Sequence, residues 1–113
     1  MALDLYAGVP VSDFDTAVEW YARFFGAPAS FLAGDTEAVW ELAEHRAVAV
    51  ELRPDRAGNA LNTLFVDDFA MRLERIALAG IQPVVKETYP NGVRHATFRD
   101  PDGNEFSLGG APE

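Results

Sequence analysis

The sequence predicts an α+β fold in which one strand-helix-strand-strand-strand (βαβββ) unit occurs twice. The order of apolar patterns in the first half of the chain returns in the second half. Val11-Ser12-Asp13-Phe14 matches Val66-Asp67-Asp68-Phe69, and Glu51-Leu52 matches Ser107-Leu108, about half the chain apart. A length of 113 residues with 49% hydrophobic residues suits one globular domain. We therefore expect one domain over residues 1–113, with repeats over about 3–54 and 59–109.

The first repeat begins with period-two alternation, which is typical of a strand with one buried face, at Leu3, Leu5, Val9 and Val11. Apolar residues spaced by three and four from Phe14 to Phe25 then predict a helix. Ser12-Asp13 offers a capping side chain at its start, and Gly26 is expected to end it in a left-handed conformation. Three strands should follow over 29–32, 38–42 and 48–52, before Pro54 and Gly58 close the unit.

The second repeat follows the same order. Residues 61–66 read as a strand, Asp67-Asp68 as helix caps, and Gly80 as the end of the helix. Three more strands are expected over 81–85, 93–98 and 105–108. Asp100-Pro101-Asp102-Gly103-Asn104 joins the last two, because proline presets one dihedral angle and glycine accepts a positive one. Each unit thus has one helix to cover one face of its strands, and the opposite face is where function is expected.

Composition excludes several classes of partner. The formal net charge of -9 and a pI near 4.5 argue against binding of nucleic acid or anionic lipid. The sequence contains no cysteine, which excludes disulfides, thiolate metal sites and thiol nucleophiles. The first residues show neither a signal peptide nor a membrane span, so we expect a cytoplasmic protein.

Three segments together resemble the vicinal oxygen chelate superfamily of glyoxalases, extradiol dioxygenases, fosfomycin-resistance enzymes and bleomycin-binding proteins. They are Val9-Pro10-Val11-Ser12-Asp13 with the helix that carries Trp20-Tyr21 and ends at Phe24-Phe25-Gly26, then Phe65-Val66-Asp67-Asp68, then Phe98 to Asn104. The resemblance spans Leu3 to Gly109. It implies paired units that form a curved mixed sheet around a cavity for a ligand or metal, usually completed by a homodimer.

The same resemblance implies where a metal would bind. Enzymes of the family hold a divalent ion through the first and last strands of each unit, at places that fall here on Tyr6, Glu51, Leu61 and Ser107. Leucine cannot ligate a metal, and serine and protonated tyrosine are poor ligands. We therefore predict that the chain lacks the metal site and needs no cofactor.

Strand alternation predicts which side chains face the cavity. By parity, the helix-covered faces hold Val9, Val11, Val50, Leu52, Phe98 and Leu108. The opposite faces hold Tyr6, Gly8, Ala49, Glu51, Thr63, Phe65, His95, Thr97, Glu105 and Ser107. From this set we take Tyr6, Glu51, Thr63, Phe65, His95, Thr97 and Ser107 as candidate ligand-binding residues.

Two titratable residues are the catalytic candidates. Glu51 is a carboxylate on a sheet face, where it needs a donor, a cation or a ligand; the alternative is a partly solvated edge carboxylate. His95 carries an imidazole, the side chain that most often transfers protons in enzymes, although a strand histidine is more often structural. Trp20 lies at the margin of the first helical stripe, where a subunit contact is expected, whereas Trp40 should pack under a helix.

Three functions fit these observations. The first is a metal-independent protein that sequesters a drug-like or aromatic small molecule, as a homodimer. The second is an enzyme, either a metal-independent lyase or isomerase that uses Glu51 and His95 or a metalloenzyme whose ligands the assumed strand register misplaces. The third is a dimeric interaction module without a ligand.

Overall fold

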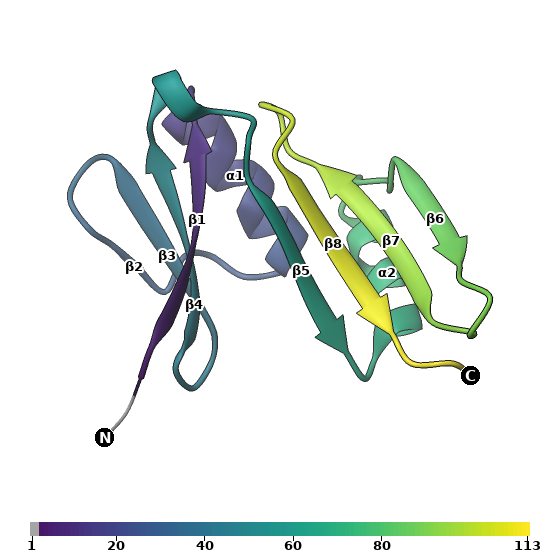
Figure 1. Ribbon diagram of the computed structural model, residues 1–113. Helices are drawn as coiled ribbons and strands as arrows, with labels where there is room; N and C mark the ends of the chain where they lie inside the picture. The colour runs from purple at the N-terminus through teal and green to yellow at the C-terminus, as the bar shows by residue number, and fades with distance from the viewer. Residues whose placement is uncertain (1–2) are drawn as a thin grey trace.

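The computed structural model describes residues 3–113 and contains both predicted βαβββ units. The first unit comprises β1 (Leu5–Val11), α1 (Phe14–Phe25), β2 (Phe31–Leu32), β3 (Glu37–Ala43) and β4 (Arg46–Leu52), followed by a short 3-10 helix, η1 (Pro54–Arg56). Its strands form sheet A in the order β1-β4-β3-β2, with β1 and β4 parallel and the other pairs antiparallel (Figure 1). The predicted α+β class and unit order are confirmed.

The second unit comprises β5 (Leu61–Val66), α2 (Phe69–Leu78), β6 (Val85–Thr88), β7 (Arg94–Arg99) and β8 (Glu105–Gly110). Its strands form sheet B in the order β5-β8-β7-β6, again with one parallel pair, β5 and β8 (Figure 1). The two sheets therefore share one topology. None of the helices within residues 3–113 is both long and apolar enough to cross a membrane.

The two helices begin differently. The Asp13 carboxylate accepts a hydrogen bond from the backbone N–H of Thr16 at 3.1 Å, as the sequence predicted, and Gly26 ends α1 with φ of 77°. Asp68 stands at the N-cap of α2 but makes no capping hydrogen bond, so the prediction of a side-chain cap there is wrong. Its carboxylate instead accepts a hydrogen bond from Arg72 at 2.5 Å, and that bond lowers the pKa of Asp68.

The second strand of the second unit, β6, lies later than predicted. Residues 81–84 contain no strand, and β6 starts at Val85. Pro83 has no N–H for a strand ladder, while the Ile81 side chain is buried in the core at 6% exposure. The apolar run over 81–85 therefore serves first to close the core and only then to form a strand.

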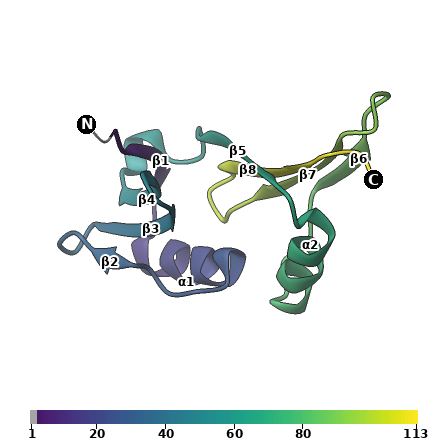
Figure 2. The same ribbon diagram turned by 90° about the horizontal axis from the view of Figure 1, so that it is seen from below.

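One apolar core joins the two units. Phe24 of α1 packs on Phe98 and Phe106 of sheet B, with ring centroids 5.2 and 5.4 Å apart. Both helices lie on the same side of the two sheets (Figure 2). Trp20 is also in this core at 8% exposure and stacks on Phe24. Its predicted place at the margin of the apolar stripe of the helix is therefore wrong.

Each sheet has a helix-covered face and an open face. Five residues predicted for the covered faces are at most 2% exposed and belong to the core: Val9, Val11, Val50, Phe98 and Leu108. Leu52, at the end of β4, is only partly buried. Trp40 packs on Tyr21 and Phe25 of α1, as predicted. The alternate residues form what we call the open face of sheet A and the open face of sheet B.

The two helices cap each other. Arg75 of α2 donates to the backbone oxygen of Phe24 at 2.9 Å, near the C-terminal end of α1. Arg23 of α1 donates to the backbone oxygen of Ala79 at 3.3 Å, just after α2. Cations at helix C-termini satisfy unpaired carbonyls and oppose the helix dipole. This reciprocal contact orients the two units toward each other.

Candidate functional site

The structure divides the candidate residues between the two open faces. Strand register places Tyr6 and Glu51 on the open face of sheet A. On the open face of sheet B lie the other five candidates, which are Thr63, Phe65, His95, Thr97 and Ser107. None of the seven candidate residues changes face through a bulge, because the register shift in sheet A lies near the end of β3, between Glu41 and Ala43.

Small side chains make up the middle of the open face of sheet A. Gly8 lies opposite Ala49, and Tyr6 lies opposite Ala47. A Cβ built on Gly8 would meet no atom within 4 Å. Ala47 and Ala49 form a second apolar cluster with Val39, separate from the main core. The surface beside Gly8 thus has room for a ligand to approach the backbone.

Glu51 lies at the end of this face and meets both a like and an opposite charge. Its cross-strand partner is Glu37, and the guanidinium of Arg53 is 3.8 Å from its carboxylate. Partial burial raises the pKa of Glu37, with further contributions from the charge of Glu51 and a hydrogen bond with it. Two carboxylates side by side favour a shared proton or a bound cation.

Hydroxyl groups form a row across the open face of sheet B. Ser107 lies opposite Thr63 on β5 and opposite Thr97 on β7. The Ser107 hydroxyl donates to the Thr97 hydroxyl at 3.2 Å, and both residues are buried, at 5% and 8% exposure. This row offers donors and acceptors, but it contains neither a base nor an acid for nucleophilic catalysis.

His95 has a carboxylate neighbour other than the predicted one. Its Nδ1 lies 3.7 Å from the carboxylate of Glu87, its cross-strand partner on β6, and has no hydrogen-bond partner. The ring of Tyr89 is 5.5 Å from the imidazole, and a hydrogen bond to Glu87 raises the pKa of that tyrosine. Glu51 lies in the other sheet, so one chain does not bring Glu51 and His95 together.

The sequence carried a signal that identifies Glu87. Asn91-Gly92 is a strong turn pair, and Gly92 adopts φ of 88° there. Tyr89 and Val93 are hydrogen-bonded across this turn, which places Glu87 opposite His95. The register set by this turn pairs Glu87 with His95, a neighbour that residue type and strand parity alone do not identify.

Phe65 and His45 complete the residues of interest. Phe65 is 67% exposed and lies over Gly109, where a Cβ would meet its ring at 3.1 Å.

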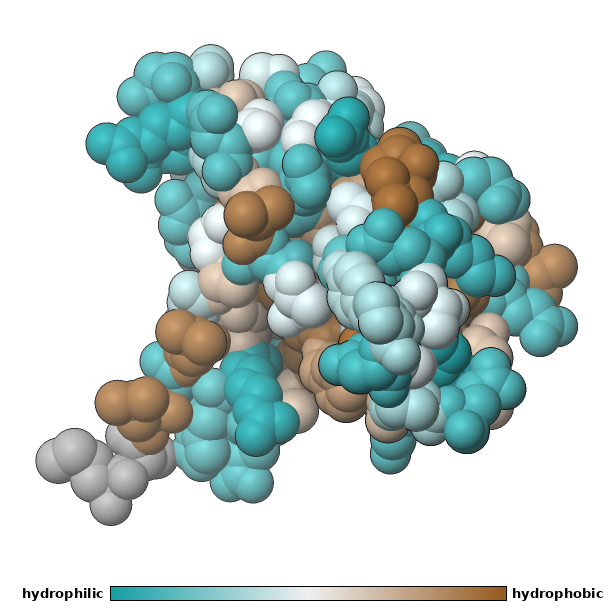
Figure 3. Space-filling view, turned by 45° about the vertical axis from the view of Figure 1, so that its right-hand side comes forward, coloured by the Kyte–Doolittle hydropathy of each residue, from teal (hydrophilic) through white to brown (hydrophobic). Residues whose placement is uncertain are grey.

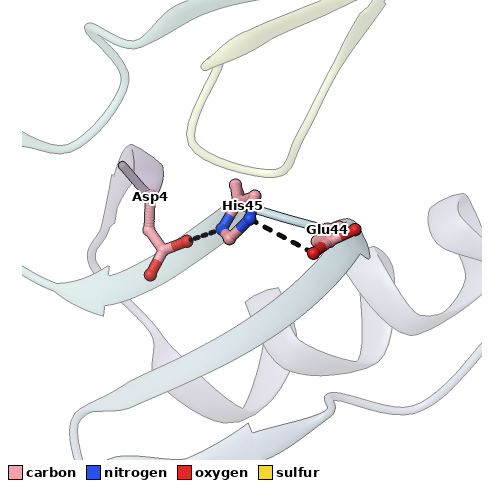
Figure 4. Close-up of polar contacts among 3 residues, drawn as sticks. All are labelled: Asp4, Glu44 and His45. Atoms are coloured by element: carbon pink, nitrogen blue, oxygen red, sulfur yellow. Dashed lines mark hydrogen bonds and ion pairs between the residues drawn. The ribbon is translucent and has the colours of Figure 1, made fainter. Parts of the chain in front are cut away.

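Figure 4 shows His45 between two carboxylates, with Nδ1 2.5 Å from Asp4 and Nε2 3.3 Å from Glu44. His45 lies in the β3–β4 turn with φ of 64°, on a different unit from His95.

The register also corrects the equivalence of the two units. Val9 pairs with Val50 and Leu64 pairs with Leu108, so Val50 corresponds to Leu108. The residue that corresponds to Ser107 is therefore Ala49, and the match of Glu51 with Ser107 is two residues off. The sequence-level match failed because it compared short segments after strands whose connecting loops differ in length.

This correction bears on the metal that the family resemblance implies. The four equivalent places now hold Tyr6, Ala49, Leu61 and Ser107, which supply two hydroxyl groups and two hydrocarbon side chains. Such a donor set does not fit a divalent ion. Among residues 3–113, no group of three or more histidine, aspartate or glutamate side chains is arranged to hold a metal.

The two open faces do not enclose a common hollow within one chain. Because both covered faces converge on one core, the open faces turn outward on different sides of the molecule (Figure 2). Large apolar side chains are exposed near the start of β1, including Leu3 at 82% and Leu5 at 66%. Figure 3 shows apolar groups on the part of the surface next to the N-terminus, at the lower left. Exposed apolar groups beside an unclosed face are typical of a protein-protein contact.

Comparison with known proteins gives a consistent result. Residues 3–108 match the model of the Glyoxalase/Bleomycin resistance protein/Dioxygenase superfamily. A solved glyoxalase / bleomycin resistance protein from Catenulispora acidiphila is 43% identical over 98% of this chain and 100% of that one, with a TM-score of 0.95. None of the curated proteins searched matches significantly.

More distant structures share the fold. TnmS3, an antibiotic binding protein from Streptomyces, is 24% identical over 100% of this chain and 98% of that chain, with a TM-score of 0.75. A bleomycin-binding protein complexed with bleomycin is 22% identical over 98% of each chain, with a TM-score of 0.74.

Proposed function

This chain belongs to the Glyoxalase/Bleomycin resistance protein/Dioxygenase superfamily, and we propose that it is a metal-independent member that binds a drug-like or aromatic small molecule. The observation that carries the proposal is the donor set at the four family metal places. Tyr6, Ala49, Leu61 and Ser107 leave no charged ligand there. In this chain, the four positions that hold an ion in other members of the family offer space and hydroxyl groups instead.

The open faces have the chemistry of a binding surface. Small residues around Gly8 allow a flat molecule to lie against the backbone of sheet A. The exposed Phe65 ring offers a stacking partner, and the Thr97–Ser107 pair offers hydrogen bonds. The carboxylates of Glu37 and Glu51 favour a ligand that carries a positive charge.

The proposed site needs two chains. Since the open faces of one chain turn away from each other, a hollow forms only when the open face of sheet A meets the open face of sheet B of a second copy. The exposed Tyr6 and Phe65, which lie on the two open faces, would become buried in such a homodimer. We propose that this dimer works in the cytoplasm and binds neither nucleic acid nor membranes, in line with its net charge of -9.

The second candidate is a lyase or isomerase. The nearness of Glu87 to His95 favours it, because a carboxylate can orient an imidazole for proton transfer. Glu51 could join His95 only across a dimer interface. The third candidate, a dimeric module without a ligand, predicts that the open faces pack shut on each other.

The test is thermal unfolding with EDTA against a panel of cationic aromatic compounds that includes bleomycin. A ligand of the folded state raises the melting temperature by mass action. Gly8→Leu, which fills the open face of sheet A, should abolish the shift, whereas Glu19→Leu on the exposed face of α1 should keep it. A shift that requires added metal, or one that Gly8→Leu leaves unchanged, argues against the proposal.

A further inference from the structure

A groove lies on the covered side of sheet B, away from both open faces. It is lined by residues of α2, of β6 and of the segment between them, and α2 lies on the helix-covered side of sheet B (Figure 2). Its volume of about 660 Å³ falls within the range of small-molecule sites, roughly 300 to 1,000 Å³.

The lining of the groove combines apolar residues with polar and charged ones. Ala70, Leu73 and Ala77 line it from one stripe of α2, and Pro83 lines it from the segment before β6. Phe69, at the start of the helix, also lines the groove. Both alanines have short side chains, which leaves room in the groove beside α2. An extended hydrocarbon or a flat ring has the shape to fill it.

The guanidinium of Arg94 lies beside Phe69 and is held in place by two contacts. The guanidinium of Arg94 lies 5.0 Å from the centre of the Phe69 ring, and its Nε donates to the backbone oxygen of Ala111 at 2.9 Å. These two contacts fix its orientation and leave the terminal nitrogens for an anion. Lys86, the single lysine of the sequence, lines the same groove and has no acidic partner within 4.0 Å among the described residues.

Three carboxylates also line the groove. Glu87 is directed to His95, and Glu74 lies on α2. Glu113 is the one that reaches Arg94: its carboxylate is 3.6 Å from the guanidinium while the side chain stays 82% exposed. A long, exposed ion pair of this kind is weak and easily exchanged.

We infer that this groove is a binding site for an amphipathic carboxylate, whose apolar body lies along α2 and whose carboxylate replaces that of Glu113 on Arg94 and Lys86. The site is independent of the proposed function of the open faces. Glu113 then acts as a weak internal competitor for the ligand. Since the contact is partly ionic, binding should weaken as the salt concentration rises.

The experiment titrates the chain with decanoate below its micellar concentration and follows backbone amide shifts by NMR, with decylammonium as the charge-reversed probe. Decanoate should shift amides of α2, β6 and residues 111–113 and bind more tightly than decylammonium. Ala77→Trp fills the groove and should abolish this binding, whereas Leu78→Trp, on the exposed side of α2, should not.

Removing a cation and removing an anion from the groove should change the affinity for decanoate in opposite directions. Lys86→Met should weaken decanoate binding by about two- to fivefold and Glu113→Gln should strengthen it by a similar factor, as expected for exposed ion pairs. Arg56→Met, an exposed cation of η1 outside the groove, should change nothing. Gly8→Leu should also leave decanoate binding unchanged, which separates this site from the open faces.

Four results overturn the inference. Decanoate shifts that map to the open faces, or binding that survives Ala77→Trp, would place the ligand elsewhere. Weaker binding in Glu113→Gln would contradict its role as a competitor. A change in the mass of the free protein on Ala77→Trp, measured by light scattering, would make the groove a contact between copies of the chain.

Discussion

Tyr21 donates its hydroxyl hydrogen to the carboxylate of Asp100 across 2.8 Å, joining α1 of the first unit to the turn before β8 of the second. Asp100 is 5% exposed and also accepts hydrogen bonds from two backbone N–H groups, of Asp102 and Asn104, and from the Asn104 side chain. Asn104 in turn donates to the backbone oxygen of Pro10 at 2.8 Å. The turn thus fastens the second unit to the end of β1.

We expect Tyr21→Phe to reduce the free energy of unfolding by about 1 to 3 kcal/mol, because a buried carboxylate loses a donor. Burial, followed by the nearby Asp100, raises the pKa of Tyr21, so the hydroxyl remains a donor at neutral pH. Urea unfolding measures the change. Tyr89→Phe, at an exposed tyrosine, should stay within about 0.5 kcal/mol of wild type. Equal effects of the two variants would contradict the role of the Tyr21–Asp100 contact.

Gly26→Ala should destabilise the chain more than Gly34→Ala. Both glycines have positive φ, 77° and 72°, so each alanine costs about 1 kcal/mol in backbone strain. Only at Gly26 would the new Cβ also meet the Arg75 guanidinium, at 2.4 Å, and displace it from the end of α1. Thermal unfolding of the two variants isolates the second effect, and equal melting temperatures would argue against the mutual capping of the helices.

Glu37→Gln should remove a pH dependence of stability. The pKa of Glu37 is raised above its ordinary value of 4.5, so the folded protein holds this proton more tightly than the unfolded chain. The stabilisation is present below that value and is lost as the pH rises through the raised pKa. Wild type should therefore lose stability relative to Glu37→Gln between acidic and neutral pH. Parallel urea midpoints for both proteins across this range would refute the raised pKa of Glu37, which burial and then the charge of Glu51 produce.

Ile81→Ala should cost about 2 to 5 kcal/mol, as expected for a buried aliphatic side chain. Leu78→Ala, at a side chain that is 84% exposed, should change stability by less than about 0.5 kcal/mol. Urea unfolding compares them. Similar values would mean that Ile81 is not the residue that closes the core after α2.

Period-two and period-3.6 patterns predicted both helices and the faces of the main strands, because burial against α1 and α2 dictates them directly. Val9, Val50 and Phe98 show this agreement. The strand over 81–85 was misplaced because an apolar run also suits a loop that fills the core, as Ile81 does. The pattern alone does not distinguish the two uses.

Candidate site residues were harder to predict than the fold. Alternation along each strand gave the correct face for Tyr6, Glu51 and His95. It does not predict which side chain of the next strand lies beside each of them. The neighbours Glu37 and Glu87 follow from hairpin register. A bulge near Ala43 shifts one of those registers in a way that no composition signal marks.

The most direct test of a donor-poor site is the metal content of the chain, measured by elemental analysis of protein purified without chelator from metal-supplemented medium. With Ala49 and Leu61 in two of the four family metal places, we expect only substoichiometric metal and no change in melting temperature after EDTA. One zinc, nickel, iron or manganese ion held tightly per chain, with a lower melting temperature after its removal, would contradict the account.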